Sequence, residues 1–502
     1  MKKLLKNVIT SALPQIINII SNLILPGFII LKFGSEINGL VSTTKTVVSY
    51  ISLVGAGIAT AVTQALYSPV ANNDNKAVKG MLRSANDMFN RYGLIYLALT
   101  LVISFIYPII IRSEISYVTI MLLLIVMSIS GASEFFAIGR CRALLYAHQK
   151  VYVCSIIQAL SLLLSLILAV LMLKLGAGII IVQFTISFVY ILRGIFLTGY
   201  IRKEYPMYSD YKSEEPIQAA VKNKKEAMIH QLAGLVVTGS QSAILTLLVD
   251  LKAASIYSVY NIVLYGIRCI CSNVFTAITP FLGKKFALNQ IADLNRVYNL
   301  AELLFFYFVN FILIVTTIMI LPFVNLYTND ADINYLFPTF AILFILSSQF
   351  YILKLPGNAL INVAGHFKET KVRALIEAGL SLVLSVLFTI SLGMEGVLIG
   401  TGIALAWRCI DTIIYSARYI LKISAKKSIF RIFLATINIL IAKNISKVFI
   451  FECKTWLDWV KFSSVFSVVA LMLLFLEVLV FERKGLFDLI TYIKKERKVK
   501  GR

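Results

Sequence analysis

The stretch "FGSEINGLVSTTKTVVSYISLVGAGIAT", residues 33–60, has the apolar composition of a membrane span but carries one lysine, Lys45. The whole 502-residue chain shares this composition, with 59% hydrophobic and only 15% charged residues. Soluble domains contain far less apolar sequence. Apolar windows of about 20 residues recur from end to end, and each suffices to cross roughly 30 Å of hydrocarbon as a helix. We therefore expect an all-α integral membrane protein.

The hydropathy pattern predicts about 14 transmembrane helices, arranged as two six-helix lobes around a central cavity plus two extra C-terminal helices. Each half begins with two spans that contain scattered polar residues. A short outer turn joins the two spans, "LKFGSEIN" in the first half and "VDLKAAS" in the second. The predicted parts are an N-lobe at 1–200, a cytoplasmic linker at 201–230, a C-lobe at 231–420, and the extra helices with a basic tail at 421–502.

The formal net charge is +23, and the Lys and Arg residues concentrate in segments that the spans place on one side of the membrane. The positive-inside rule then predicts that both termini are cytoplasmic. This asymmetry accounts for the charge without nucleic acid, and the tail "YIKKERKVKGR" is expected to lie on anionic membrane lipids. The six cysteines and three histidines show no metal-ligand spacing, so we expect no metal and no cofactor.

Three polar stripes at helical spacing interrupt the apolar spans. We expect them to face one cavity and to bind the substrate, although the amides of the first stripe are also compatible with interhelical hydrogen bonding. The stripes are Gln15, Asn18 and Asn22 in the first span; Ser42, Lys45, Ser49 and Ser52 in the second; and Tyr257, Asn261, Tyr265 and Arg268 in the eighth.

The charged members of the stripes have alternative interpretations. Lys45 lies about two turns from the outer end of its span, so snorkelling to the interface is one alternative. Arg268 lies near the midplane, where burial costs at least ~2.5 kcal/mol, so its guanidinium should face water, a carboxylate or an anionic ligand. Arg408 has Asp411 three residues later, which favours a structural ion pair. Glu134 and Glu377, near inner span ends, are expected to form interfacial pairs.

The positive charge of the polar stripes distinguishes between anionic and cationic candidate substrates. The first, second and eighth spans contain no carboxylate, whereas a cation-coupled drug antiporter normally needs one inside a lobe. A cationic cavity suits an anion, and phosphate is a common partner of both Lys and Arg. The chain also lacks the G-x-x-x-x-G-K-[ST] loop of an ATP-driven pump.

Three stretches carry a family resemblance: residues 33–71, "FGSEINGLVSTTKTVVSYISLVGAGIATAVTQALYSPVA"; residues 132–150, "ASEFFAIGRCRALLYAHQK"; and residues 229–263, "IHQLAGLVVTGSQSAILTLLVDLKAASIYSVYNIV". With them the chain resembles, over nearly its whole length, bacterial Wzx-type polysaccharide repeat-unit flippases of the multidrug/oligosaccharidyl-lipid/polysaccharide (MOP) exporter superfamily. In the related lipid II flippases, cationic cavity residues in early spans of both lobes are similar in placement to Lys45 and Arg268. This chain lacks their fuller arginine set.

The resemblance implies a transporter of the bacterial cytoplasmic membrane, and not an enzyme. Its cargo would be an undecaprenyl-pyrophosphate-linked oligosaccharide, flipped by alternating access for capsule, O-antigen or exopolysaccharide assembly. A polysaccharide polymerase and glycosyltransferases would be its partners. Three alternatives remain: a MATE-like, cation-coupled multidrug antiporter; a lipid II flippase; and a membrane-embedded glycan polymerase or ligase, against which the short outer loops argue.

Overall fold

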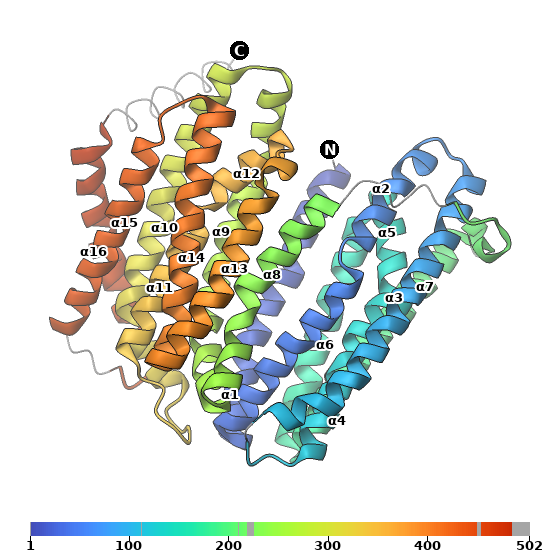
Figure 1. Cartoon of the computed structure of the whole chain (residues 1–502), viewed down its shortest axis with the longest axis horizontal. Coiled ribbons are helices and arrows are strands. Elements are labelled where there is room, and N and C mark those ends of the chain that lie inside the picture. The colour runs from blue at the N-terminus through green and yellow to red at the C-terminus, as the bar shows by residue number, and fades with distance from the viewer. Residues whose placement is uncertain (1, 112, 209, 218–224, 449–452, 484–502) are drawn as a thin grey trace. The chain divides into compact units, whose positions relative to one another are not determined.

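A computed structural model describes residues 2–111, 113–208, 210–217, 225–448 and 453–483 (Figure 1). These residues are helical and contain no strand, as expected. Twelve helical stretches among them are long and apolar enough to cross a membrane. The basic tail and the linker segment 218–224 lie outside the described residues, so the expected placement of the tail on lipid headgroups is not tested.

The chain divides into two compact units, and the boundary falls within one helix. The first unit comprises Met1–Ile262 together with the tetrapeptide Asp330–Ile333, and the second comprises the remainder. The first unit therefore extends past residue 200 because two further helices pack onto its core. The helices of the first unit are α1 (Lys2–Ser52), α2 (Ile58–Ala71), α3 (Asn75–Ile110), α4 (Tyr117–Ser133), α5 (Gly139–Ala147), α6 (Val151–Lys174), α7 (Ile179–Glu204), α8 (Lys225–Leu248) and the beginning of α9 (Leu251–Ala287).

The second unit continues from α9 and includes the two extra C-terminal helices. Within it α13 packs closely on α14, α14 also packs on α11, and α10 contacts both α15 and α16. Its remaining helices are α10 (Ile291–Tyr327), α11 (Pro338–Leu353), α12 (Leu355–Ala364), α13 (Phe367–Leu392), α14 (Met394–Tyr415), α15 (Lys426–Val448) and α16 (Trp456–Phe481).

A sharp reversal divides α1 into two spans. Gly34 has φ 84° and ψ 171°, a conformation that is essentially restricted to glycine. The carboxylate of Asp332 accepts hydrogen bonds from the backbone N–H and the hydroxyl of Ser35, the N–H bond at 2.9 Å, and so caps the second limb. With the two limbs counted separately and the shorter apolar helix Leu232–Leu248 added, the helix count agrees with the expected ~14 spans.

The second limb of α1 packs against α8 and the start of α9 through polar contacts. Asn38 donates to the hydroxyls of Ser255 at 2.7 Å and Ser258 at 2.9 Å. The hydroxyl oxygens of Thr43 and Thr246 are 2.6 Å apart. Buried polar groups join membrane helices by such interhelical hydrogen bonds. The two predicted outer turns, one from each half of the sequence, therefore meet inside the first unit.

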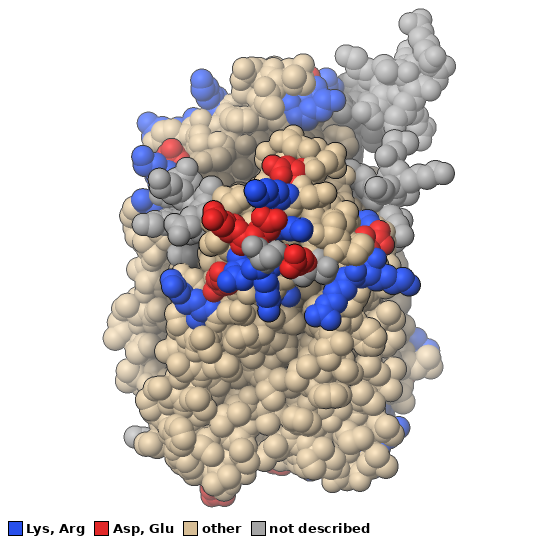
Figure 2. Space-filling model, turned by 90° about the vertical axis from the view of Figure 1, so that its right-hand side faces the viewer, with Lys and Arg blue, Asp and Glu red and all other residues tan. Residues whose placement is uncertain are grey.

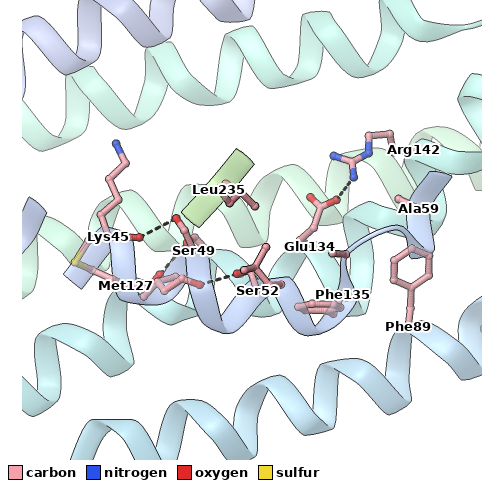
Figure 3. A pocket seen from close by; sticks show the side chains of 16 residues that line it. Lys45, Ser49, Ser52, Ala59, Phe89, Met127, Glu134, Phe135, Arg142 and Leu235 are labelled. Atoms are coloured by element: carbon pink, nitrogen blue, oxygen red, sulfur yellow. Dashed lines mark hydrogen bonds and ion pairs between the residues drawn. The ribbon is translucent and has the colours of Figure 1, made fainter. Parts of the chain in front are cut away.

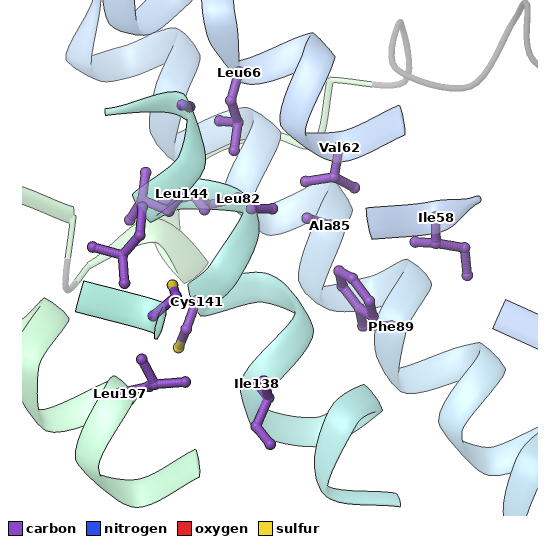
Figure 4. Packing of buried hydrophobic residues seen from close by; sticks show 14 of the residues in the cluster. Ile58, Val62, Leu66, Leu82, Ala85, Phe89, Ile138, Cys141, Leu144 and Leu197 are labelled. Atoms are coloured by element: carbon purple, nitrogen blue, oxygen red, sulfur yellow. The ribbon is translucent and has the colours of Figure 1, made fainter. Parts of the chain in front are cut away.

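A buried apolar cluster packs α2, α3, α5 and α7 together in the first unit (Figure 4). Its members are mostly aliphatic and aromatic side chains packed against one another, and close packing, not exclusion of water, holds helices together in lipid. They include Leu66 of α2, Leu82 of α3, Leu144 of α5 and Leu197 of α7, each at most 3% exposed. This packing fixes the helices that carry the candidate site.

The outer face of the first unit is apolar over most of its area. Figure 2 shows Lys, Arg, Asp and Glu gathered in one band, with an almost uncharged face below it. Exposed apolar side chains on this part of the chain include Leu101 and Phe105 of α3, Ile167 of α6 and Ile195 of α7. Such a face is suited to contact with lipid chains. Together with the apolar helices, it shows a multi-pass membrane protein.

Candidate functional site

A cavity of about 500 Å³ opens within the first unit, between helices that carry the expected polar residues (Figure 3). Its wall is made by α1, α2, α3, α4, α5, α8 and the two short helices η1 (Leu53–Gly55) and η2 (Glu134–Ile138). The polar side chains on this wall are Lys45, Ser49, Ser52, Ser130, Glu134 and Arg142. All the residues that line the cavity belong to the first unit.

Lys45 lies on the cavity wall, and its side chain is exposed. Its ammonium group donates a hydrogen bond to Oδ1 of Asn22 at 3.2 Å. Among the described residues no carboxylate lies within ion-pair distance of Lys45. An ammonium with a neutral amide partner is not neutralised by it, so this end of the cavity can attract an anion.

The other members of the second-span stripe do not all face the cavity. Ser49 and Ser52 line it, and their hydroxyls donate to the carbonyls of Lys45 and Val48, both at 2.8 Å. Their oxygens retain acceptor capacity. Ser42 instead lies 3.4 Å from the hydroxyl of Ser242 on α8, at the helix interface. The stripe is therefore divided between cavity and packing contact.

The amides of the first span also differ in position. Asn22 contacts Lys45, as described above. Gln15 is exposed and Asn18 is partly buried, and neither is among the residues that line this cavity. The structure thus places one of the three expected amides beside Lys45. Binding of substrate by the other two stays a prediction.

The stripe on α9 spans the boundary between the two units. Tyr257 and Asn261 belong to the first unit, where Tyr257 is buried at 5% exposure and Asn261 is partly buried. Tyr265 and Arg268 belong to the second, where the Tyr265 side chain is exposed. Whether this stripe and Lys45 bind one substrate together stays a prediction.

Arg268 packs its guanidinium over two aromatic rings of α11. The distances from its Cζ to the ring centroids are 6.0 Å for Phe344 and 5.7 Å for Tyr351. Cation–π contacts of this kind hold a guanidinium in place. The side chain is partly buried. Arg268 is thus a positioned cation within the second unit.

Arg408 and Asp411 form an ion pair at 2.7 Å inside a larger buried network of α11 to α14. Glu377 accepts from Lys354 and lies 3.3 Å from Nε of Arg408, and Arg373 also pairs with Asp411. Arg408, Glu377 and Lys354 are each at most 9% exposed at the side chain. This mutual pairing gives the network a structural role in the second unit.

Glu134 and Arg142 were not expected in the site. Nη2 of Arg142 lies 2.6 Å from Oε1 of Glu134, and both side chains are one-third exposed on the cavity wall. Glu134 begins the π-helix η2, whose extra residue per turn changes the direction of the following side chains. The sequence signal was the spacing of Glu134 from Met127 and Ser130, which precede it by seven and four residues, share its α-helical face and also line the cavity.

No protein-family model matches the sequence, and no curated protein matches it. Solved structures match over most of the chain. The lipid II flippase MurJ, in an inward closed conformation, has 14% identity and a TM-score of 0.67, covering 94% of this chain and 100% of that chain. An inward-facing multidrug resistance MATE family transporter of the MOP superfamily has 13% identity and a TM-score of 0.64, covering 85% and 98%. The chain therefore has a MATE/MurJ-like fold.

Proposed function

We propose that the protein flips undecaprenyl-pyrophosphate-linked oligosaccharide repeat units from the inner to the outer leaflet of the bacterial cytoplasmic membrane. The observation that carries this proposal is Lys45: a lysine on the wall of a cavity in a unit built of apolar helices, with a neutral amide as its hydrogen-bond partner. A cation within a membrane span is costly unless it serves an ion or ligand. A diphosphate is the part of such a cargo that needs a cation.

The fold supports transport of a lipid-linked molecule. Among the solved structures that match, a lipid II flippase aligns over 94% of this chain, and an inward-facing MATE transporter aligns over 85%. The two extra helices α15 and α16, which pack on α10, fall in the C-terminal part of the chain. A flippase lets the polar headgroup pass through a wet cavity while the polyprenyl chain stays in lipid, so the headgroup never enters hydrocarbon.

No covalent step is required for this function. Two negative charges that move outward across an inside-negative potential of 100 mV gain roughly 4 to 5 kcal/mol from the field. That energy is sufficient to bias the direction of flipping without ATP, and it decreases if cationic side chains move with the cargo. A polysaccharide polymerase would consume the flipped product, and glycosyltransferases would supply the substrate.

The test uses cells that make the glycan and depend on this protein for its export. Lys45→Gln and Arg268→Gln should reduce surface polymer and raise the inner-leaflet lipid-linked intermediate. Lys32→Gln is a matched control, because Lys32 is also on α1 but donates to the carbonyl of Leu173 and does not line the cavity. Normal export by correctly inserted Lys45 variants would refute the proposed site.

A multidrug antiporter is the second candidate, and Glu134 is the observation that favours it. A carboxylate in the cavity is the group that a proton, a sodium ion or a cationic drug would bind. Here Arg142 already compensates its charge at 2.6 Å. An antiporter should tolerate Lys45→Gln and should lose drug resistance with Glu134→Gln, whereas a flippase of anionic lipid should lose export with Lys45→Gln.

A further inference from the structure

The Glu134–Arg142 pair lies at the other end of the cavity from Lys45. Figure 3 shows Lys45, Ser49 and Ser52 in sequence along α1, with the carboxylate–guanidinium pair beyond Ser52. Seven residues of helix separate Lys45 from Ser52, which corresponds to a rise of about 10 Å. A diphosphate in contact with the Lys45 ammonium therefore does not reach the pair. The pair faces whatever is attached to the diphosphate.

The chemistry of this end differs from that of Lys45. Glu134 and Arg142 compensate each other's charge, and both side chains are one-third exposed to the cavity. The buried Arg193 of α7 interacts electrostatically with both of them. Glu134 has a second carboxylate oxygen, Oε2, beyond the one that binds Arg142, and Arg142 offers further N–H donors. Ser52 and Ser130 add hydroxyl oxygens to the same wall. A carboxylate on the wall suits a hydroxyl-rich sugar, from which it accepts hydrogen bonds, better than a phosphate, which it repels.

The local backbone supports a dedicated role for the pair. Glu134 begins the π-helix η2, and the next residue, Phe135, packs under Gly55 so closely that a Cβ there would meet its ring at 2.1 Å. A π-helical turn is rare, and such turns are frequent at functional sites. An ion pair that only joined η2 to α5 would need neither a cavity beside it nor side chains exposed to that cavity.

We propose that Glu134 and Arg142 form a sugar-recognition subsite that binds the first sugar of the cargo while Lys45 binds its diphosphate. This inference rests on the proposed flippase function. Glu134 accepts hydrogen bonds from sugar hydroxyls, and Arg142 holds the carboxylate in position and donates to ring or hydroxyl oxygens. The subsite accordingly contributes to the choice of glycan, and Lys45 contributes affinity that is common to all glycans.

The experiment measures binding to the purified full-length protein in nanodiscs. The probes are bare undecaprenyl pyrophosphate and the same lipid carrying one glucose, galactose or N-acetylglucosamine. The wild type should bind at least one sugar-bearing probe more tightly than the bare lipid. Glu134→Gln and Arg142→Gln should lower that preference about tenfold and leave the bare lipid unaffected, whereas Lys45→Gln should weaken all probes.

Two controls separate recognition from folding. Glu204→Gln removes a carboxylate from the Lys150–Glu204 ion pair of the same unit, away from the cavity, and should change neither affinity. The exchange Glu134→Arg with Arg142→Glu keeps the ion pair and should keep thermal stability, but it should not restore the sugar preference. Restoration by the exchange would show a structural role.

The possible failures are distinguishable. An unchanged sugar preference in both Glu134→Gln and Arg142→Gln overturns the subsite alone, as does an equal loss for bare and glycosylated lipids. Wild-type protein that binds none of the probes overturns the proposed function, and the subsite with it. If Glu134→Gln loses the sugar preference and Lys45→Gln binds all probes as the wild type does, the diphosphate site at Lys45 is overturned. The sugar-recognition subsite is then still supported.

Discussion

The ammonium group of Lys45 donates to the amide oxygen of Asn22 at 3.2 Å, although the two residues are 23 positions apart and both belong to α1. A straight helix would separate them by roughly 35 Å. The contact exists because Gly34, at nearly equal sequence distance from both, reverses the chain. The hairpin thus places the amide of Asn22 from the first span beside Lys45 of the second. This amide accepts a hydrogen bond from the Lys45 ammonium group but does not neutralise its charge.

Asn22→Asp should abolish the anion-binding property of Lys45. A carboxylate at this position would form an ion pair across the hairpin and compensate the ammonium charge. Transport of lipid-linked glycan should fall about tenfold, which corresponds to the loss of one charge-assisted hydrogen bond. The measurement is surface polymer at matched expression. Asn22→Ala, which leaves the charge intact, should have a smaller effect, and equal activity of Asn22→Asp and wild type would contradict the account.

Gly34→Ala should destabilise the first unit by about 1–3 kcal/mol, because a Cβ is strained at φ 84° and ψ 171°. The added carbon would also lie 3.3 Å from Oδ2 of Asp332, which caps the second limb. Thermal unfolding in detergent measures the effect. Gly379→Ala is the control, since this helical glycine has open space around it and should gain slight stability. Equal melting temperatures for Gly34→Ala and wild type would show that the reversal does not need glycine.

Glu377→Ala should cost about 3–5 kcal/mol of stability, because it leaves the buried Lys354 without its counter-charge and removes one of the two carboxylates that pair with Arg408. Glu204→Ala, which breaks the more exposed pair with Lys150, should cost only about 0–1 kcal/mol. Comparing the unfolding of both variants tests the difference between buried and exposed pairs. A similar small loss for both would mean that water reaches the network of the second unit.

His148, in the turn between α5 and α6, should make the protein less stable in mild acid. Burial and the nearby charge of Lys150 lower the pKa of His148 from its ordinary value of 6.5. The ring centroid of His148 lies 4.4 Å from that of Tyr205, and Tyr208 is also near. The unfolded chain binds the proton more readily, so this contribution is complete above pH 6.5 and is lost as the pH falls below it. His148→Phe, which keeps the ring contact, should flatten the decrease of melting temperature between about pH 7 and pH 5.

The sequence was sufficient for the membrane class, the approximate number of helices and the two polar hairpins, because hydrocarbon thickness and backbone hydrogen bonding leave few alternatives. It also placed Lys45 on a polar face. The same spacing assigned Ser42 to the cavity, and this prediction was wrong. Ser42 contacts Ser242 instead, because the neighbouring helix α8 covers part of that face.

Two other features depended on information that helical periodicity does not contain. Arg142 pairs with Glu134 across eight residues that include a π-helix, and residue type alone does not reveal that interruption of α-helical spacing. The aromatic partners of Arg268, Phe344 and Tyr351, lie far away in sequence on α11. Long-range contacts of this kind follow from the packing of helices and not from a pattern within one of them.

The most direct test of the central claim is a translocation assay in proteoliposomes that contain undecaprenyl-pyrophosphate-linked sugar labelled in one leaflet. Wild-type protein and Lys45→Arg should move the label to the opposite leaflet, and Lys45→Gln should move it about tenfold more slowly at equal reconstitution, since only the first two keep the cation. Translocation by Lys45→Gln at the wild-type rate, or no translocation by the wild type, would contradict the account.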